Sequence, residues 1–371
     1  MEKKYIVVSP YLSGLGNVLM SLEISYAMAY ITGRTLIIPP SVYMVFINEG
    51  FSRDTFPKYW DIFDRNVVSS EFDIIDYYEF EEFKPHYDEL PKFAWSENLP
   101  IIFDSVFNKI DYPTDRPEGN LFANGDICFV CGLEKYKNDE DFINFAGNRF
   151  IVDLNREEKY IHFDSNLYQN FYYYVYPGDK NERNKLKDKV NKAISYKSRF
   201  FDLAKKAIET INCEYNATHL RRNDFFVQFG FALKTVETSE KYYDVCSELF
   251  ESDKPLYVSS DEKDRSFFDK LKEKYKIYFA EDVFSDLNLL ETAIVEQIIC
   301  SEADKFIGTS PSTYSKRINI LRGLKGKSIY PKMGINEQMN IVGFDSALPW
   351  VTTDFKRWEW NMSPHPQWMK E

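Results

Sequence analysis

Residues 5–40 decide the fold class, and they read YIVVSPYLSGLGNVLMSLEISYAMAYITGRTLIIPP. The short apolar run at 5–8 predicts a strand, and the Leu-, Met- and Ala-rich stretch at 18–31 predicts a helix. Gly33 is placed to end that helix, and the run at 34–38 predicts a second strand before two prolines. A strand, a crossover helix and a strand at this spacing predict a parallel pair, and therefore an α/β protein.

Strands and helices alternate again in the last part of the chain. Helices are predicted over 198–210, 241–250, 261–275, 288–301 and 312–322, with Asp261 as the cap of the third. Strands are predicted over 215–218, 256–260, 276–280 and 305–308. This alternation predicts a doubly wound α/β domain whose strand-to-helix loops all lie at one edge of the sheet.

The organisation of the whole chain follows from its length. A chain of 371 residues exceeds the usual size of one hydrophobic core, so two domains are expected. We place them at 1–185 and 186–335, with a tail at 336–371 that packs across a domain. The stretch from 41 to 179 is less regular. Strands are predicted within it at 100–103, 126–130 and 171–176, and a helix is predicted at its end, over 179–192.

The composition argues against several kinds of partner. A formal charge of −12 and a pI near 5.1 leave no basic face for nucleic acid. No apolar run approaches about 20 residues, so no membrane span is predicted. The apolar run near Met1 is too brief for a signal peptide. We therefore expect a cytoplasmic protein if Met1 is the native start, and a protein of the secretory pathway if a leader was trimmed.

Cysteines and acidic pairs do not indicate a metal site. The five cysteines form no regular framework, which is typical of a reducing compartment. The CxxC pair at 128–131 has the flanks of a buried strand, which favours an inert role. The acidic triplet at 139–141 lies in a polar loop rather than at a strand end, so we assign no metal to it.

Three loops at strand ends carry residues suited to chemistry, and the first lies before the first helix. Residues 14–17 read GLGN. Gly14 and Gly16 would let the backbone approach a ligand closely, and the following helix offers N–H groups and a positive dipole end. An ordinary tight turn explains the same residues about equally well.

The second loop reads THLRRNDF over 218–225, where a strand should end. Two arginines there could bind an anionic phosphate, because each presents a planar fork of charged donors. The alternative is a structural ion pair between Arg222 and Asp224. His219 could act as a base or donate to a phosphate, but it could equally be a structural hydrogen-bonding group.

The third loop reads GTSPSTY over 308–314 and enters a helix at Ser312. Its hydroxyls and backbone amides could hold a phosphate, although simple N-capping by Ser310 or Ser312 explains them too. Glu296 lies on the preceding helix, which we expect to be strongly amphipathic. Its carboxylate could accept two N–H donors from the edge of a base, or it could lie on an exposed face of that helix.

Taken together, these loops resemble the GDP-fucose-dependent protein O-fucosyltransferase family. The resemblance rests on GLGN at 14–17, RTLIIPP at 34–40, HLRRNDF at 219–225, and EQIIC at 296–300 followed by FIGTS at 306–310. The motif HLRRNDF at 219–225 is most similar to the branch that modifies thrombospondin repeats. The resemblance covers about 1–40 and 215–320, and it implies a GT-B-like fold with two Rossmann-like domains that face a central cleft.

The resemblance also implies roles for individual residues. Arg221 would contact the β-phosphate of the donor and stabilise the departing GDP, and Glu296 would hold the guanine, where the family commonly has Asp. The other implied contacts with the nucleotide sugar are made by Gly14, Leu15, Gly16, His219, Ser312, Thr313 and Tyr314.

The catalytic groups implied for the acceptor are less complete. Asn17 would lie beside donor and acceptor. The thrombospondin branch has a glutamate just before its Gly-rich turn, and here Ser13 stands at about that position. Asp224, Glu23 or no protein base at all therefore remain as alternatives.

The predicted function is an inverting, metal-independent transfer of fucose from GDP-fucose to a Ser or Thr hydroxyl of a protein. A fixed guanidinium can stabilise the negative charge that grows on the departing diphosphate, so the reaction needs no cofactor. One alternative is an enzyme that acts on a glycan or uses another GDP-sugar. A second alternative, of a different class, is a non-catalytic protein that binds nucleotide sugars.

Overall fold

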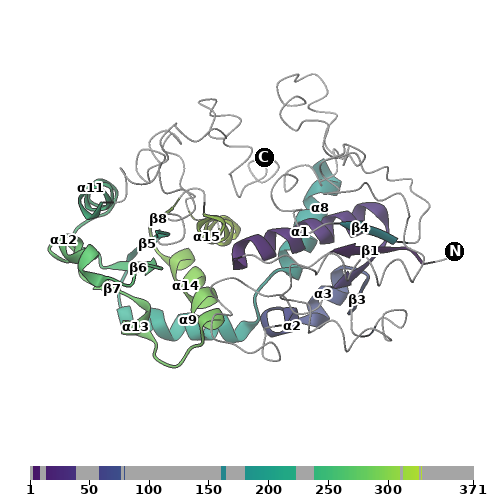
Figure 1. The fold of residues 1–371 in the computed structure, drawn as a ribbon, viewed down its shortest axis with the longest axis horizontal. Helices are drawn as coiled ribbons and strands as arrows, with labels where there is room; N and C mark the ends of the chain where they lie inside the picture. Colours follow the sequence, from purple (N-terminus) through teal and green to yellow (C-terminus); the bar gives the residue numbers. More distant parts are fainter. Residues whose placement is uncertain are drawn as a thin grey trace, which may run out of the picture. The chain divides into compact units, whose positions relative to one another are not determined.

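The computed structural model describes residues 3–8, 14–38, 58–76, 79, 160–163, 180–222, 238–309, 312–325 and 327. The chain divides into two compact units, Met1–Lys197 and Ser198–Glu371, and each is described here by itself (Figure 1). The tail at 336–371, the strands predicted at 100–103, 126–130 and 171–176, the CxxC pair and the acidic triplet at 139–141 lie outside the described residues.

The first unit contains a four-stranded parallel sheet in the order β3-β2-β1-β4. The strands are β1 Tyr5–Val8, β2 Thr35–Ile38, β3 Ile74–Asp76 and β4 Tyr160–Phe163. Helix α1, Leu15–Thr32, connects β1 to β2. Because Tyr5 pairs with Thr35 and Val7 with Ile37 in parallel register, the βαβ unit predicted from the sequence is confirmed.

Helix α1 begins earlier than the sequence indicated. Gly14 is its N-cap and Leu15 its first residue, so the prediction of a loop up to residue 17 is wrong for the last three positions. Leu15 is buried together with Val18, Leu19 and Leu22, and this burial outweighs the weak helix propensity of the neighbouring glycine. At the other end, Gly33 takes φ 63° and donates its N–H to Ala29 and Tyr30, as predicted for a glycine cap.

Three further helices complete the described part of the first unit: α2 Tyr59–Ile62, α3 Arg65–Glu71 and α8 Lys180–Ala193. The predicted helix at 179–192 corresponds to α8. Lys189 and Lys192 of α8 both pair with Glu71 of α3, at 3.2 and 3.0 Å. The sequence placed the domain boundary within this helix, whereas the division in the structure follows it at Lys197.

The second unit contains a parallel sheet in the order β7-β6-β5-β8. The strands are β5 Asn216–Leu220, β6 Leu256–Ser260, β7 Ile277–Tyr278 and β8 Phe306–Gly308. The helices are α9 Ser198–Ile211, α11 Ser239–Leu249, α12 Asp269–Lys272, α13 Ala280–Val283, α14 Leu289–Glu302 and α15 Thr313–Leu324. This is the doubly wound arrangement that the alternating pattern predicts.

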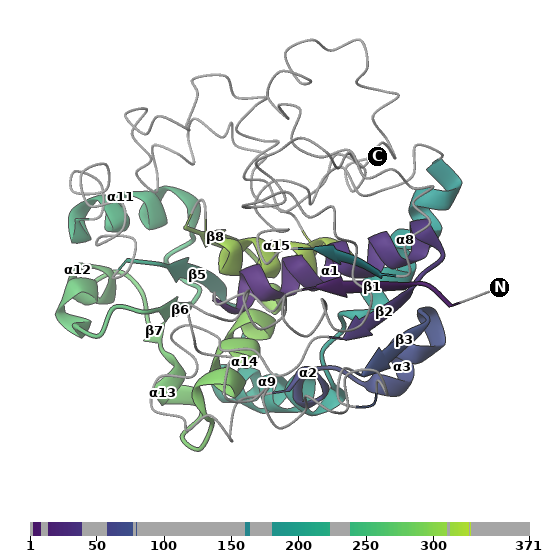
Figure 2. The same cartoon turned by 45° about the vertical axis from the view of Figure 1, so that its right-hand side comes forward.

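Helices cover both faces of this sheet (Figures 1 and 2). On one face, side chains of α11 and α12 pack against Leu256 and Val258 of β6 in a single apolar cluster. On the other face lies α14, where Tyr257 of β6 bonds to Glu296. Successive residues of β6 therefore point to opposite layers, as the geometry of a strand requires.

Two helices of the second unit differ from their predictions. The continuous helix expected over 261–275 is instead a 3-10 turn, Arg265–Phe268, followed by the short helix α12. Asp264, and not Asp261, is the N-cap, because its carboxylate accepts the N–H of Ser266. Helix α14 is not amphipathic but buried on most sides, and its buried residues are Leu290, Ile294, Val295, Gln297, Ile298, Ile299, Cys300 and Ser301.

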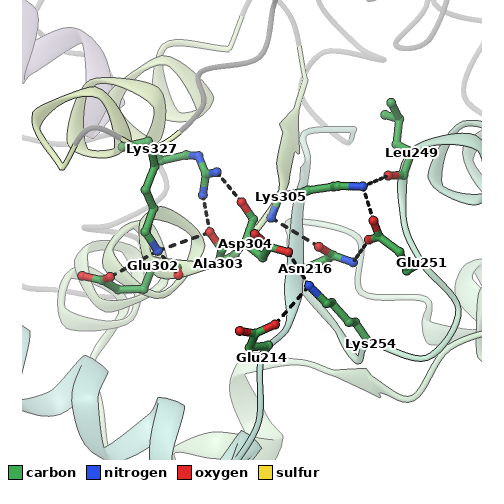
Figure 3. A network of polar contacts seen from close by, with 11 residues as sticks. Glu214, Asn216, Leu249, Glu251, Lys254, Glu302, Ala303, Asp304, Lys305 and Lys327 are labelled. Carbon is green, nitrogen blue, oxygen red and sulfur yellow. Dashed lines mark hydrogen bonds and ion pairs between the residues drawn. The ribbon is translucent and has the colours of Figure 1, made fainter.

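Ion pairs join the loops before the strands to the amino ends of those strands (Figure 3). Lys254 pairs with Asp304 and with Glu214, the latter at 3.2 Å. Lys305 pairs with Glu251 and donates to the carbonyl of Leu249 at 3.2 Å. This network lies at the edge of the sheet that is opposite the carboxyl ends of the strands, so it is a structural feature of the second unit.

Candidate active site

The carboxyl ends of β5, β6 and β8 bring the predicted residues together. In the parallel register, Leu220 of β5 pairs with Ser260 of β6, and His219 pairs with Gly308 of β8. The residues that follow these pairs are Arg221, Asp261 and Thr309, and they must therefore be neighbours at one edge of the sheet. Loops at this edge are the usual ligand sites of open α/β sheets.

Thr309 ties β8 to β5 with three hydrogen bonds. Its backbone N–H and its hydroxyl both donate to the carbonyl oxygen of His219, each at 3.0 Å. The same hydroxyl oxygen accepts the N–H of Arg221 at 2.8 Å. Because Thr309 is only 1% exposed, these bonds are shielded from water and hold the backbone on both sides of Leu220.

Arg221 is held on its other side by β6. Its Nε lies 3.7 Å from Oδ2 of Asp261, and the two side chains are 20% and 26% exposed. The Oδ1 atom of the same carboxylate accepts the N–H of Arg222 at 2.8 Å. The guanidinium predicted to bind phosphate is thus a partly exposed cation whose backbone and side chain are both anchored.

Arg222 has a different set of contacts. Its guanidinium pairs with the buried carboxylate of Glu262 and lies over the ring of Phe267, 4.4 Å from the ring centroid. Glu262 in turn accepts the N–H of Asp264 at 2.8 Å. The sequence suggested Asp224 as the partner of Arg222, but Asp224 lies outside the described residues and Glu262 is the partner that the structure places there.

His219 is a buried, neutral side chain. Its Nδ1 is 2.6 Å from the hydroxyl of Ser315, and its ring lies 4.6 Å from the ring of Tyr314. Burial, and secondly the nearby charge of Arg221, lower the pKa of His219 to about 3. A group with such a low pKa is a weak base at neutral pH, so the hydrogen-bonding role considered from the sequence fits this environment better than a basic one.

The first turn of α15 follows Thr309. Ser312 is buried at the N-cap position and donates its N–H to the carbonyl of Thr309 at 2.9 Å, but its side chain forms no cap hydrogen bond. Thr313 is the first helical residue, and the hydroxyl of Tyr314 donates to the carbonyl of Ala293 at 2.6 Å. The N-capping alternative is therefore wrong for the Ser312 side chain, and the first-turn amides of α15 form a positive helix end at this edge.

Glu296 lies on α14, one turn after Ala293, and is half-buried rather than exposed. Its carboxylate accepts the hydroxyl of Tyr257 at 3.1 Å. Burial raises the pKa of Glu296 to about 7, although hydrogen bonds from Tyr257 and Ser259 act in the opposite direction. A carboxylate in this position can accept N–H donors from a ligand and titrates near neutral pH.

The remaining predicted residues belong to the first unit or cannot be placed. Gly14, Leu15 and Gly16 form the start of α1 after β1, and a Cβ atom at Gly14 would meet nothing within 4 Å. The first-turn amides there offer a second helix N-terminus. Asn17 lies in that same turn, and its side chain is outside what the structure describes.

Sequence reasoning missed four side chains that organise the site: Asp261, Glu262, Thr309 and Ser315. Thr309 stood within a quoted motif, but its bonds become visible only when β8 is placed beside β5. Asp261 and Glu262 follow β6 directly, so pairing β5 with β6 in parallel register could have identified them. Within the described ranges, no cluster of three or more His, Cys, Asp or Glu is arranged for a metal, and no helix could cross a membrane.

Comparisons with known proteins are consistent with this geometry. A family model described as GDP-fucose protein O-fucosyltransferase matches residues 5–325, while no curated protein sequence matches the chain. The apo form of POFUT1 is 15% identical, over 88% of this chain and 97% of that one, with a TM-score of 0.50.

Two other solved structures are similar at lower scores. POFUT1 in complex with GDP-fucose is 16% identical, over 87% of this chain and 94% of that one, with a TM-score of 0.47. Fucosyltransferase NodZ from Bradyrhizobium is 13% identical, over 86% and 94%, with a TM-score of 0.46. The parallel sheets and the likeness to apo POFUT1 confirm the predicted α/β, GT-B-like fold class.

Proposed function

The chain belongs to the GDP-fucose protein O-fucosyltransferase family, and from this premise we propose that it transfers fucose from GDP-fucose to a Ser or Thr hydroxyl of a protein. The transfer inverts the anomeric centre and uses no metal. The motif HLRRNDF at 219–225 supports an acceptor of the thrombospondin-repeat type. The observation that carries the proposal is the anchoring of Arg221 between Thr309 and Asp261 at the carboxyl edge of the sheet.

Arg221 supplies the electrostatic part of the mechanism. Fucosyl transfer passes through a state in which negative charge grows on the departing diphosphate. A guanidinium that is already fixed in place stabilises this charge without reorganising during the reaction. The first-turn amides of Thr313 and Tyr314 add a positive helix end, which also favours phosphate.

The other groups divide between base recognition and the acceptor. Glu296 accepts N–H donors of the guanine through its carboxylate. Glu23, one of the acceptor bases considered from the sequence, is only 2% exposed, and His219 is neutral. We therefore assign removal of the acceptor proton to Asp224, or to no protein base at all.

The proposal is tested by incubating the full chain with GDP-fucose and with two panels of acceptors, folded thrombospondin-type repeats and free oligosaccharides. Mass spectrometry would detect fucose on a Ser or Thr of the protein. Transfer to oligosaccharides alone would show that the acceptor is a glycan and not a protein. Binding of GDP-fucose without transfer to either panel would favour the non-catalytic alternative.

A pair of variants tests the role of Arg221. Arg221→Ala should lower turnover roughly 100- to 1,000-fold, as expected when a preorganised charge donor is removed, with little change in thermal stability. The control is Arg222→Ala, which leaves the buried Glu262 without its guanidinium. It should cost about 1–3 kcal/mol of unfolding free energy but change the turnover of folded protein only a few-fold. Substantial turnover by Arg221→Ala would contradict the mechanism.

A further inference from the structure

We propose that Asp261 is a positioning residue that sets the orientation of the Arg221 guanidinium for the β-phosphate. This inference rests on the proposed function, because it takes Arg221 as the group that contacts the diphosphate. Asp261 follows β6 directly, and its carboxylate is the anion that the structure places against Nε of Arg221 at 3.7 Å.

The strand register explains why this carboxylate reaches Arg221. Leu220 pairs with Ser260, so the next residues of the two parallel strands lie side by side. The hydroxyl of Ser260 donates to the carbonyl of Leu220 at 2.9 Å, which closes the two strand ends against each other. Asp261 is therefore held beside Arg221 by the sheet and not by a flexible loop.

Both oxygens of the Asp261 carboxylate are engaged with the same arginine pair. Oδ1 accepts the backbone N–H of Arg222 at 2.8 Å, which fixes the carboxylate relative to the β5 backbone. Oδ2 is thereby directed at Nε of Arg221. The same carboxylate is thus hydrogen-bonded to the backbone N–H of Arg222 and ion-paired with the Arg221 guanidinium, which favours one orientation of that side chain.

The chemistry of the guanidinium suits this arrangement. Arginine has five N–H donors in a planar fork, so an ion pair at Nε is compatible with a second anion bound through the Nη groups. Holding the fork in one plane before the diphosphate arrives avoids an ordering cost during the reaction. A partly exposed ion pair such as Arg221 with Asp261 adds little to folding stability. We therefore expect its main effect to be on the orientation of the guanidinium.

The neighbouring carboxylate provides a matched comparison. Glu262 is one residue further along, is 8% exposed at its side chain, and pairs with Arg222. It also bonds to the backbone N–H of Asp264, within its own loop. The two carboxylates thus pair with different guanidinium groups, and Asp261 is the one expected to act through Arg221.

The test compares affinities for GDP and GMP, which differ by the β-phosphate. Calorimetry on the full chain would give the ratio of the two affinities for wild type, Arg221→Ala, Asp261→Asn and the double variant. Loss of one charge-assisted contact should reduce the ratio about tenfold in Arg221→Ala. Asp261→Asn keeps an oxygen acceptor for the Arg222 N–H, and it should reduce the ratio about three- to tenfold. Adding it to Arg221→Ala should reduce the ratio no further.

Three results would overturn the inference. An unchanged ratio in Asp261→Asn would show that orientation does not depend on this carboxylate. If Asp261→Asn reduced the ratio of GDP to GMP affinity equally in the wild-type chain and in Arg221→Ala, Asp261 would act by a route other than Arg221. Glu262→Gln, the control, should leave the ratio unchanged, and a reduction of the same size there would make the effect unspecific to Asp261.

The same measurements separate this inference from the proposed function. An unchanged ratio in Arg221→Ala would remove the β-phosphate contact and with it both proposals for Arg221. If the ratio fell in Arg221→Ala and in Asp261→Asn but no acceptor received fucose, the positioning of Arg221 would be supported and the fucosyl transfer rejected. With an active enzyme, Asp261→Asn should lower kcat several-fold more than it raises the KM for GDP-fucose.

Discussion

At the scale of single residues, the charge state of Glu296 links nucleotide binding to pH. Its carboxylate lies between α14 and β6, in contact with Tyr257, and burial raises its pKa to about 7. Guanine presents N–H donors, so only the ionised carboxylate can accept both of them. A protonated Glu296 offers one acceptor fewer and carries no charge to strengthen the contact.

The affinity for GDP should therefore rise with pH through the pKa of Glu296. Between pH 8 and pH 6 the binding constant should fall about tenfold, because most Glu296 side chains take up a proton over this range. Glu296→Gln should flatten the profile, which calorimetry with GDP at a series of pH values would check. A wild-type profile identical to that of the variant would remove Glu296 from base recognition.

The stability of the folded chain should change with pH in the opposite sense. A carboxyl whose folded pKa is raised holds its proton in the folded state while the unfolded chain has already released it. Glu296 therefore lowers stability as pH rises from about 4.5 to about 7. Urea unfolding at a series of pH values should show that Glu296→Gln becomes more stable relative to wild type as pH rises through this window.

At the scale of secondary-structure elements, the contact between β8 and α15 depends on Gly308. A Cβ atom at this position would lie 2.5 Å from Oγ and 2.6 Å from Cβ of Ser315. The helix can come this close to the strand only because the glycine has no side chain. The close approach also brings Ser315 within hydrogen-bonding distance of His219 on the adjacent strand.

Gly308→Ala should destabilise the protein by about 1–3 kcal/mol, because α15 must move away from the strand. Thermal unfolding would measure the loss, and GDP affinity should fall with it as the first turn of α15 shifts. Ser315→Gly removes both crowded atoms, so the double variant should lose less stability than the sum of the two single changes. Gly14→Ala is the control for stability, since nothing lies within 4 Å of its added Cβ. Equal losses at the two glycines would contradict the steric explanation.

Another element contact explains how α14 and α15 are held together. Arg322 of α15 is fully buried and donates to the carbonyls of Ala303 and Asp304, at 2.6 and 2.8 Å, after the end of α14. It satisfies backbone groups that the helix itself cannot. Since Ala293 of α14 also accepts from Tyr314, the two helices are fixed to each other near both ends of their contact.

At the scale of the whole molecule, the second unit has two chemically distinct edges. The carboxyl edge of its sheet carries the partly exposed arginine, a helix N-terminus and Glu296. The amino edge carries ion pairs such as Lys254 with Glu214 and Lys305 with Glu251 (Figure 3). Among the described residues, the carboxyl edge combines a partly exposed arginine with a helix N-terminus, and both of these groups suit a phosphate.

Binding of GDP should therefore slow hydrogen exchange at one edge only. Peptides that include Arg221, Asp261 or Thr309 should gain protection, because the bound nucleotide covers these strand ends and opposes their opening. Peptides that include Glu214 or Lys254 should exchange at the same rate with and without GDP. Exchange measured by mass spectrometry on the full chain would check this, and equal protection at both edges would argue against a site at the carboxyl edge.

The sequence by itself determined the order and type of most described elements. Short runs with strand character marked β1, β2, β5, β6 and β8, and Gly33 marked the end of α1. These signals are local, since each depends on neighbours within one turn or one strand. The elements α2, α3, α13, β3 and β4 were not predicted, and all of them except α3 have four residues or fewer.

The tertiary structure alone decided how the site residues are used. Two arginines are adjacent in the sequence, and their roles separate only through Asp261 and Glu262, which lie 39 and 40 residues after Arg222. Thr309 reaches Arg221 from 88 residues away, and Ser315 reaches His219 from 96. Parallel register and a close strand-to-helix contact create these neighbours. No local pattern encodes them, because a long-range pair leaves no trace in the residues adjacent to either partner.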